Sequence, residues 1–339
     1  MKKIAFLAVV FFVLVSTARA QFKYVSVDYP GAMKTWVWGI NNQGEMVGAY
    51  RPSDQPTRHA MLVDNGKFIP LAPKTVLGTS YSEAFKINDW GDIVGNFCDD
   101  SCHGFLLHKG QLTILDYPGA SNTTAFGIND VGVVVGYWDL ADADGNILFV
   151  RGFQWKDGLF TFVSYPGTGD ITLIANNNLG TTVGIWDAGI TSTISHGFVG
   201  WKEYFSSFDA PYPDVTFTQA DGINDLGIIV GQEYTVDELA NDTGHGFLRK
   251  NGKFTQLNYP GAMQTTAWGI NNLMQMVGNW LDDVNVYHGW FAVPCDKDLP
   301  RWAGMLSQRA SDAALTPATP NAAVTDSVSP RKQTFPRLE

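Results

Sequence analysis

The sequence has few cysteines and a shortage of positive charge. Of its 339 residues only three are Cys, and 23 Lys and Arg stand against 33 Asp and Glu, for a formal net charge of -10. The cysteine count excludes a disulfide-dense scaffold. The acidic balance excludes the basic surface that binding to nucleic-acid phosphates requires, and it disfavours contact with an anionic membrane. We therefore expect no nucleic-acid partner.

Long apolar runs are also missing after the N-terminus, so we expect no membrane span, which takes about 20 apolar residues. At the N-terminus, Lys2 and Lys3 precede the apolar run Ile4 to Val15, and Ala18-Arg19-Ala20 has a small-x-small pattern. This order is typical of a secretory signal peptide. We predict that residues 1–20 are removed near Ala20, which takes away three positive charges and changes the net charge from -10 to -13. The protein is then secreted, into the periplasm or out of the cell.

What the sequence does contain is an internal repeat. A segment of the form Gly-Ile-Asn-x-x-Gly-x-x-Val-Gly begins at Gly39 and recurs with spacings of 47, 41, 48, 47 and 47 residues. All six copies keep the Val-Gly, and five keep the middle Gly, which is Met274 in the last copy. The repeated asparagines are Asn41, Asn88, Asn129, Asn177, Asn224 and Asn271.

Each repeat reads as four short strands, here named a to d. In the last repeat, strand a is Thr266 to Ile270, strand b Gln275 to Trp280 and strand c His288 to Val293, while Phe254 to Tyr259 is the preceding strand d. The Asn-x-x-Gly segments suit tight a-to-b hairpins, and Tyr-Pro-Gly at 29, 117, 165 and 259 suits type II turns between strands d and a. Four-stranded repeats of about 40 to 50 residues have the size of β-propeller blades.

The two ends of the chain complete each other. Phe22 to Asp28 is a strand d without its own strands a to c, and the sixth repeat stops after strand c at Val293. We therefore predict an all-β, six-bladed β-propeller over residues 21–294, with four-stranded blades, closed by the N-terminal strand. An open β-solenoid is the alternative. From Cys295 the periodicity stops, and residues 295–339, rich in Ala, Ser, Thr and Pro, are predicted to be a mostly disordered tail with a short helix around Trp302 to Arg309.

The Gly-Ile-Asn-x-x-Gly segments, the signal peptide and the His-Gly-Phe triplets at 103, 196 and 245 resemble the HAF-type probable extracellular repeat family, named for its His-Ala-Phe triplet. The resemblance spans about residues 24–293. The triplets of the other three repeats differ: they are His59-Ala60-Met61, Arg151-Gly152-Phe153 and His288-Gly289-Trp290. The resemblance implies repeats of propeller type and export, and it transfers no site residue.

Five histidines open strand c, and aromatic residues close strand b, in most of the repeats. Equivalent positions on different blades are spread around a ring, so the histidines cannot converge on one metal ion. We interpret each His as a bridge between backbone groups of its own blade, and the aromatic residues as filling between blades. The alternative is stacking of sugars on exposed rings, for which the candidate binding residues are Trp138, Trp186 and Trp280.

Acidic residues supply the remaining binding candidates. Asp139, Asp142, Asp144 and Asn146 form an oxygen-rich loop, but its Gly is misplaced for an EF-hand. We interpret it as a solvated loop and keep Ca²⁺ as an alternative, with no other cofactor predicted. The face of the propeller that carries the b-to-c and d-to-a connections, here called the loop face, has the variable segments, so a ligand is expected there. Asp187 and Asp282 are further candidates on this face.

The fifth repeat breaks the pattern with two carboxylates. Asp221 replaces an apolar residue before the strand-a glycine, and Glu233 replaces the strand-b aromatic residue. Paired carboxylates could serve acid-base catalysis, so these two are the catalytic candidates. The alternative is that they are merely solvated or paired. Cys98 and Cys102 are predicted to form a disulfide in an oxidising compartment, with Cys295 left free.

No catalytic motif of the hydrolase, zinc-protease, phosphate-binding-loop or sialidase type occurs. We therefore expect a monomeric extracellular binding or interaction module, whose ligand is a carbohydrate or a protein. The alternative is a single-site extracellular hydrolase or lyase on the same scaffold, because propellers host both kinds of function. The number of equivalent binding sites separates the two hypotheses.

Overall fold

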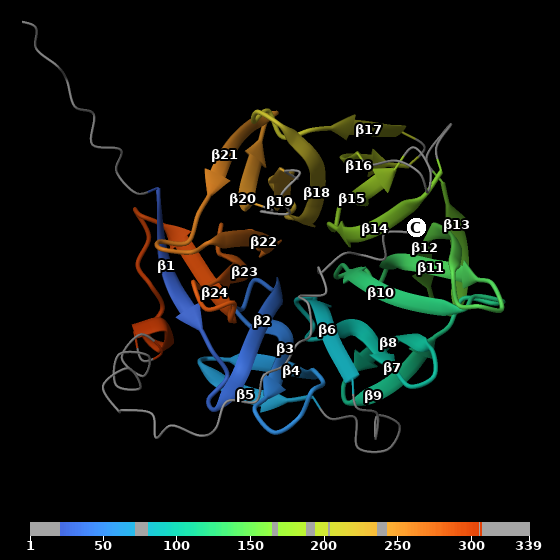
Figure 1. The fold of residues 1–339 in the computed structure, drawn as a ribbon, viewed down its shortest axis with the longest axis horizontal. Helices are drawn as coiled ribbons and strands as arrows, with labels where there is room; N and C mark the ends of the chain where they lie inside the picture. The colour runs from blue at the N-terminus through green and yellow to red at the C-terminus, as the bar shows by residue number, and fades with distance from the viewer. Residues whose placement is uncertain are drawn as a thin grey trace, which may run out of the picture.

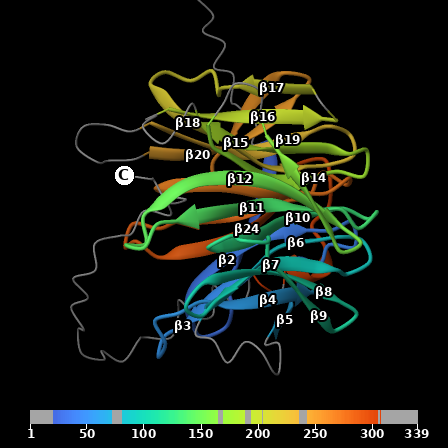
Figure 2. The ribbon, with the colours of Figure 1, turned by 90° about the vertical axis from the view of Figure 1, so that its right-hand side faces the viewer.

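The structure is a computed structural model that describes residues 21–71, 81–164, 169–187, 194–202, 204–235, 243–304 and 306. These residues form 24 strands, arranged as units around a central axis (Figure 1). Figure 2 shows the ring from the side, with the unit β10 to β13 toward the viewer. The predicted signal peptide, the Tyr-Pro-Gly turn at 165 and the predicted tail beyond residue 306 lie outside the described residues.

The order of strands follows the predicted a-b-c-d repeat. The strands a lie next to the axis: β2 (Ala32–Ile40), β6 (Tyr81–Ile87), β10 (Asn122–Ile128), β14 (Ile171–Asn176), β18 (Val215–Ile223) and β22 (Gln264–Ile270). The strands b are β3 (Met46–Pro52), β7 (Ile93–Cys98), β11 (Val134–Ala141), β15 (Thr181–Asp187), β19 (Ile229–Thr235) and β23 (Met276–Leu281).

The outer strands complete each unit. The strands c are β4 (His59–Asp64), β8 (Cys102–His108), β12 (Ile147–Lys156), β16 (Ser195–Trp201), β20 (Thr243–Lys250) and β24 (Tyr287–Pro294). The strands d are β5 (Lys67–Pro70), β9 (Gln111–Leu115), β13 (Leu159–Val163), β17 (Tyr204–Phe208), β21 (Lys253–Leu257) and β1 (Phe22–Val27).

The sheet count corrects the prediction of six separate four-stranded sheets. The described strands form four four-stranded sheets and one eight-stranded sheet, which runs from β14 to β21. The join is a single parallel pair, Ser195 of β16 with Phe217 of β18.

The N-terminal strand pairs with the last strand of the chain, as the unmatched ends of the sequence predict. β1 runs antiparallel to β24, from Phe22 opposite Pro294 to Val27 opposite Gly289, and it is the outermost strand of its sheet. Figure 1 shows the blue β1 beside the orange-red β24. The pairing covers an edge that would otherwise expose unpaired backbone groups.

The glycine of each Val-Gly pair is required by the packing of strand b on strand a. Each strand a has a register shift near its end, between Val37 and Gly39 in β2. At this bend the carbonyl oxygen of Trp36 approaches Gly48 so closely that a Cβ atom would overlap it. The same overlap occurs at all the equivalent glycines: Gly95, Gly136, Gly184, Gly231 and Gly278. A side chain there would push the two strands apart.

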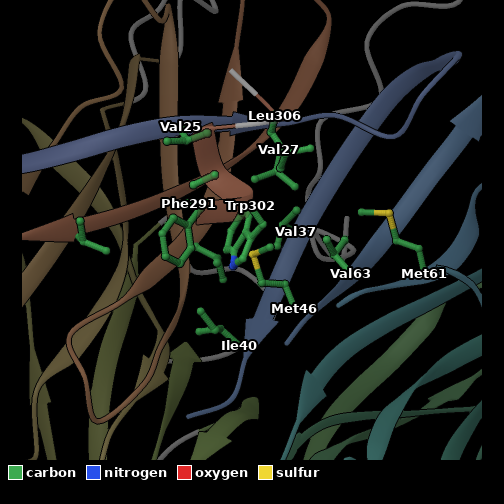
Figure 3. Packing of buried hydrophobic residues seen from close by; sticks show 13 residues of the cluster. Val25, Val27, Val37, Ile40, Met46, Met61, Val63, Phe291, Trp302 and Leu306 are labelled. Carbon is green, nitrogen blue, oxygen red and sulfur yellow. The ribbon is translucent and has the colours of Figure 1, made fainter. Parts of the chain in front are cut away.

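Part of the chain beyond residue 294 packs on the propeller, where the short helix was predicted. Residues 301–304 are helical, and Trp302, Ala303 and Leu306 are buried. They pack with Val25 and Phe291 in one hydrophobic cluster, which Figure 3 shows. Composition alone predicts a tail here, because three apolar residues are few. They nevertheless cover apolar residues of the sheet that contains β1.

Candidate functional site

The a-to-b turns form a closed ring of hydrogen bonds around the axis. In each turn the asparagine Nδ2 donates to the backbone oxygen of the equivalent asparagine in the next repeat, at 2.9 to 3.2 Å. The ring runs through Asn41, Asn88, Asn129, Asn177, Asn224 and Asn271 and returns to Asn41. Each side-chain oxygen also accepts backbone N–H groups of its own turn, as in Asn129 with Val133 at 2.9 Å.

The residue after each asparagine forms a second ring. The backbone N–H of each donates to a side-chain oxygen of the next, at 2.7 or 2.8 Å, through Asn42, Asp89, Asp130, Asn178, Asp225 and Asn272. Sequence reasoning treated these residues as hairpin formers only. The signal was visible as two neighbouring positions of nearly constant type, but their partners lie in the next repeat, 41 to 48 residues away, or 230 residues away where the ring closes. The two rings line a hollow at the centre of this face of the molecule, here called the turn face.

Two charged side chains interrupt the apolar lining of the axis. Lys86 stands where the other repeats have Gly or Ala, and its Nζ donates to the backbone oxygens of Trp38 at 3.0 Å and Trp268 at 2.9 Å. Asp221 stands where the others have Trp, Phe or Ile, and it is fully buried. Gln219 Nε2 donates to Asp221 Oδ1 at 2.5 Å, whereas Oδ2 accepts no hydrogen bond within the described residues.

Burial governs the ionisation of both groups. It raises the pKa of Asp221 well above its usual range, against the opposing effects of Gln219 and of the charge of Lys86. It lowers the pKa of Lys86, against the opposing charge of Asp221. The sequence identified Asp221 as unusual but missed Lys86, although a lone Lys among Gly and Ala was a visible departure.

The structure does not bring Asp221 and Glu233 together as a catalytic pair. Glu233 lies opposite Thr218, while Asp221 lies on the same side of the sheet as Gln219. Neighbouring residues of a strand point to opposite faces, so the two carboxylates face away from each other. Glu233 is buried and accepts a hydrogen bond from Gln256 Nε2 at 3.1 Å, and burial raises its pKa.

The strand-c histidines contact side chains, which corrects the interpretation of them as backbone bridges. The Nδ1 atoms of three of them lie within 3.0 Å of the aspartate that ends strand d: His103 with Asp116, His196 with Asp209 and His288 with Asp28. His245 makes the same contact with Asn258 at 2.8 Å. These contacts tie strand c to strand d, so the repeated histidines have a structural role in four repeats.

The candidate tryptophans are stacked on other rings of the protein. Trp280 stacks on Tyr259 and on His288, with centroid distances of 4.5 and 4.3 Å. Trp138 stacks on Tyr117 at 4.4 Å, and Trp186 on His196 at 4.7 Å. The tyrosines come from the Tyr-Pro-Gly turns, which explains why that turn recurs.

The acidic loop candidates mostly organise their own loops. Asp142 Oδ1 accepts the backbone N–H groups of Asp144 and Asn146 at 2.9 Å, and these contacts, led by those of Asn146, lower its pKa. Asp282 makes the same kind of turn with Val284 and Val286.

Of the two other acidic candidates, Asp139 is buried and Asp187 is partly buried. Asp139 is 2% exposed and accepts a hydrogen bond from Asn122 Nδ2 at 2.8 Å, and burial raises its pKa. Burial likewise raises the pKa of Asp187. Within the described ranges, no group of three or more His, Cys, Asp or Glu side chains could hold a metal ion.

The predicted disulfide is confirmed. Cys98 and Cys102 are joined, with an S–S distance of 2.08 Å, at the end of β7 and the start of β8. Cys295 is exposed and belongs to no disulfide within the described residues. The bridge closes a b-to-c loop on the loop face.

A group of charged and aromatic residues lies where strands of the first, second and sixth repeats reach the loop face. Lys34 is cross-strand from Arg51, and its Nζ lies 5.5 Å from the ring centroid of Tyr287. Arg58 Cζ lies 4.0 Å from the ring centroid of Trp36. We call this the basic-aromatic cluster, with the members Lys34, Trp36, Arg51, Arg58, Glu83 and Tyr287.

Charge in this cluster is only partly neutralised. Arg58 Nη1 forms an ion pair with Glu83 Oε1. Among the residues described, Lys34 and Arg51 form no ion pair, and Arg51 Nη2 contacts only the sulfur of Met33. Burial and the charges of Arg51 and Arg58 lower the pKa of Lys34. Sequence reasoning missed this cluster because its members come from three repeats.

The ring of units with innermost strands a around one axis makes the chain an all-β β-propeller. Within the described residues, no helix has the length and apolar character needed to cross a membrane. No protein-family model matches the sequence, and no curated protein sequence matches it.

Several solved structures are similar to the chain. A fungal lectin from Aleuria aurantia, a six-bladed β-propeller that recognises fucose, has 8% identity and a TM-score of 0.46 over 78% of this chain and 93% of its own. An oligogalacturonate lyase from Vibrio parahaemolyticus has 9% identity and a TM-score of 0.48 over 83% and 96%. The β-propeller domain of a trilobed protease from Pyrococcus furiosus has 8% identity and a TM-score of 0.44, over 76% of this chain and 95% of its own. Such low identities transfer no residue and no activity.

Proposed function

We propose that the chain is an exported six-bladed β-propeller that binds an extracellular ligand at one site on its loop face. The six-blade count treats the eight-stranded sheet as two blades, because a single residue pair joins its halves. Six-membered rings of turn residues support this count. Export rests on the signal-peptide pattern of residues 1–20, and the resemblance to HAF-type repeats is part of the same proposal.

The basic-aromatic cluster is the observation that carries the single-site proposal. Features that recur in the repeats, such as the His contacts and the stacked tryptophans, are used to hold the blades together. The cluster, in contrast, occurs once, and among the described residues its Lys34 and Arg51 form no ion pair and lie beside aromatic rings. Unpaired cations and aromatic faces at one end of a rigid scaffold are typical of a ligand site.

The second candidate is a hydrolase or lyase that uses the same cluster. Glu83, 5% exposed, is a carboxylate close to the hydroxyl of Tyr81, and burial, aided by Glu83, raises the pKa of that hydroxyl. A phenol kept protonated beside a carboxylate could give a proton to a leaving group at the cluster. Binding remains the first proposal because no attacking nucleophile is placed there.

A glycan array followed by calorimetric titration tests both candidates. We expect binding with a stoichiometry of one per chain, with reduced affinity in Arg51→Gln and unchanged affinity in the control Lys253→Gln, an exposed cation on β21. Several equivalent sites would contradict the single-site proposal. Release of shorter products from a bound oligosaccharide, detected by mass spectrometry, would favour the enzymatic candidate.

A further inference from the structure

The basic-aromatic cluster lies at strand ends that converge on the axis at the loop face. Lys34 is near the start of β2, Arg51 near the end of β3, and Tyr287 begins β24. Arg58 precedes β4, and Glu83 lies on β6. Because these ends belong to the first, second and sixth repeats, the cluster bridges the position where the ring closes.

The charges of the cluster leave a local excess. Lys34, Arg51 and Arg58 give three positive charges, Glu83 cancels the charge of Arg58, and Asp282 acts on Lys34 from the neighbouring loop. The net charge of the cluster with Asp282 is therefore about +1, in a chain with a formal net charge of -10. Like charges held this close destabilise each other unless an anion relieves them.

Unpartnered polar atoms lie in the same place. Trp36 is 2% exposed, and its Nε1 has no hydrogen-bond partner among the residues that the structure describes. Within the same residues, Arg51 Nε is buried without a partner. Buried N–H groups in folded proteins are nearly always satisfied, so two orphan donors beside excess positive charge indicate a missing acceptor. The donors are of the type that a carboxylate satisfies well, because an Arg fork binds its two oxygens together.

We propose that the basic-aromatic cluster binds the carboxylate of an acidic sugar, with Arg51 and Lys34 as its contacts and the ring of Tyr287 flanking the sugar. This inference rests on the proposed function and names the class of its ligand. A single carboxylate matches the local excess of one charge. The net charge of -10 opposes the binding of polyanions, so nucleic acids and highly sulfated polymers are poor candidates.

Matched sugars provide the test. Calorimetric titration of the protein with the methyl glycosides of glucuronic acid and of glucose compares two ligands that differ only at C6, and N-acetylneuraminic acid and inorganic phosphate form two further arms. We expect an acidic sugar to bind at least tenfold more tightly than the glucose glycoside. We expect Arg51→Gln and Lys34→Met each to reduce that affinity about tenfold, which is the loss of one charge-assisted contact. Lys253→Gln should leave it unchanged.

The outcomes separate this inference from the proposed function. If neutral sugars on the array bind at one site and the acidic sugars bind no better, the carboxylate inference is overturned and the proposed function stands. If phosphate competes more strongly than the acidic sugars, the ligand is a phosphate and the inference is again overturned. If acidic sugars bind but ignore both Arg51→Gln and Lys34→Met, the site lies elsewhere. If no saccharide binds, both the inference and the carbohydrate form of the proposed function fail.

Discussion

Lys86 Nζ in the second repeat donates a hydrogen bond of 2.9 Å to the backbone oxygen of Trp268 in the sixth, 182 residues later. The same Nζ bonds Trp38 in the first repeat. One buried ammonium group therefore connects three repeats across the axis, next to the position where the chain closes its ring. Its charge is balanced in part by Asp221 from the fifth repeat.

Replacing Lys86 should be strongly destabilising. Lys86→Met leaves Asp221 without its counter-charge and two backbone oxygens without a donor, so we expect a loss of about 3 to 5 kcal/mol in the free energy of unfolding. Urea unfolding followed by tryptophan fluorescence measures it. The double variant Lys86→Met, Asp221→Leu should recover part of the loss, because no uncompensated charge is left. A double variant less stable than Lys86→Met would show that the two charges are not coupled.

The asparagine ring should also be sensitive to a single change. Asn129→Ala removes the hydrogen bond to Asn177 O and leaves the Val133 N–H without its acceptor, so we expect a loss of about 2 to 3 kcal/mol. Asn146→Ala is the control, because Asn146 is exposed and bonds only within its loop; its cost should stay below about 0.5 kcal/mol. Equal costs in the two variants would argue against a structural role for the ring.

The His288 contacts predict a pH dependence. Burial lowers the pKa of His288, but hydrogen bonds with Asp28 and Asp282, and their charges, raise it overall. A raised histidine pKa contributes stability that is fully present below the unfolded value of about 6.5 and lost as pH rises through the folded value. The melting-temperature difference between the wild type and His288→Gln should therefore be larger at low pH than at high pH.

A second variant at the same contact provides the control for this dependence. In the Asp28→Asn background the pH effect of His288→Gln should shrink, because one of the two charges that raise the histidine pKa is gone. A difference between wild type and His288→Gln that is constant across the pH range would mean that the histidine acts by packing alone.

The disulfide should stabilise only its own loop, and the fold should not depend on it. By the loop-closure estimate, a bridge over the short loop from Cys98 to Cys102 contributes about 2 kcal/mol. Reduction should therefore lower the melting temperature modestly, and the cooperative transition should remain. Mass spectrometry after alkylation under native, non-reducing conditions should label only Cys295, and two further labels should follow reduction. Labelling of all three without reductant would contradict the bridge.

Local signals in the sequence were sufficient for the strands and for the pairing of β1 with β24. Periodic segments mark strands a to d, and an unmatched strand at each end leaves one way to complete the ring. The eight-stranded sheet was not predictable, because it depends on the single residue pair of Ser195 with Phe217, which no sequence pattern marks. The short helix around Trp302 was predicted, but its burial was not, because that burial depends on a surface formed by other strands.

The candidate site was harder to predict from the sequence, because its contacts also depend on how the strands are arranged. Asp221 and Glu233 both broke the repeat pattern, but only strand geometry shows that they face opposite ways. Lys34 and Arg51 lie in one repeat and could be recognised as neighbours, whereas Glu83 comes from the second repeat and Tyr287 joins only when the ring closes. A site assembled from three repeats has no compact motif.

The pairing of β1 with β24 also sets an order of events during folding. Asp28 and His288 are 260 residues apart. During synthesis β1 therefore has no partner until β24 has been made. Until then the sixth repeat has an open edge and the cluster at the closure does not exist. Because such long-range pairing is slow and leaves edges exposed, the nascent protein is most vulnerable to aggregation just before completion. Ligand binding thus reports that the whole chain has been made and closed.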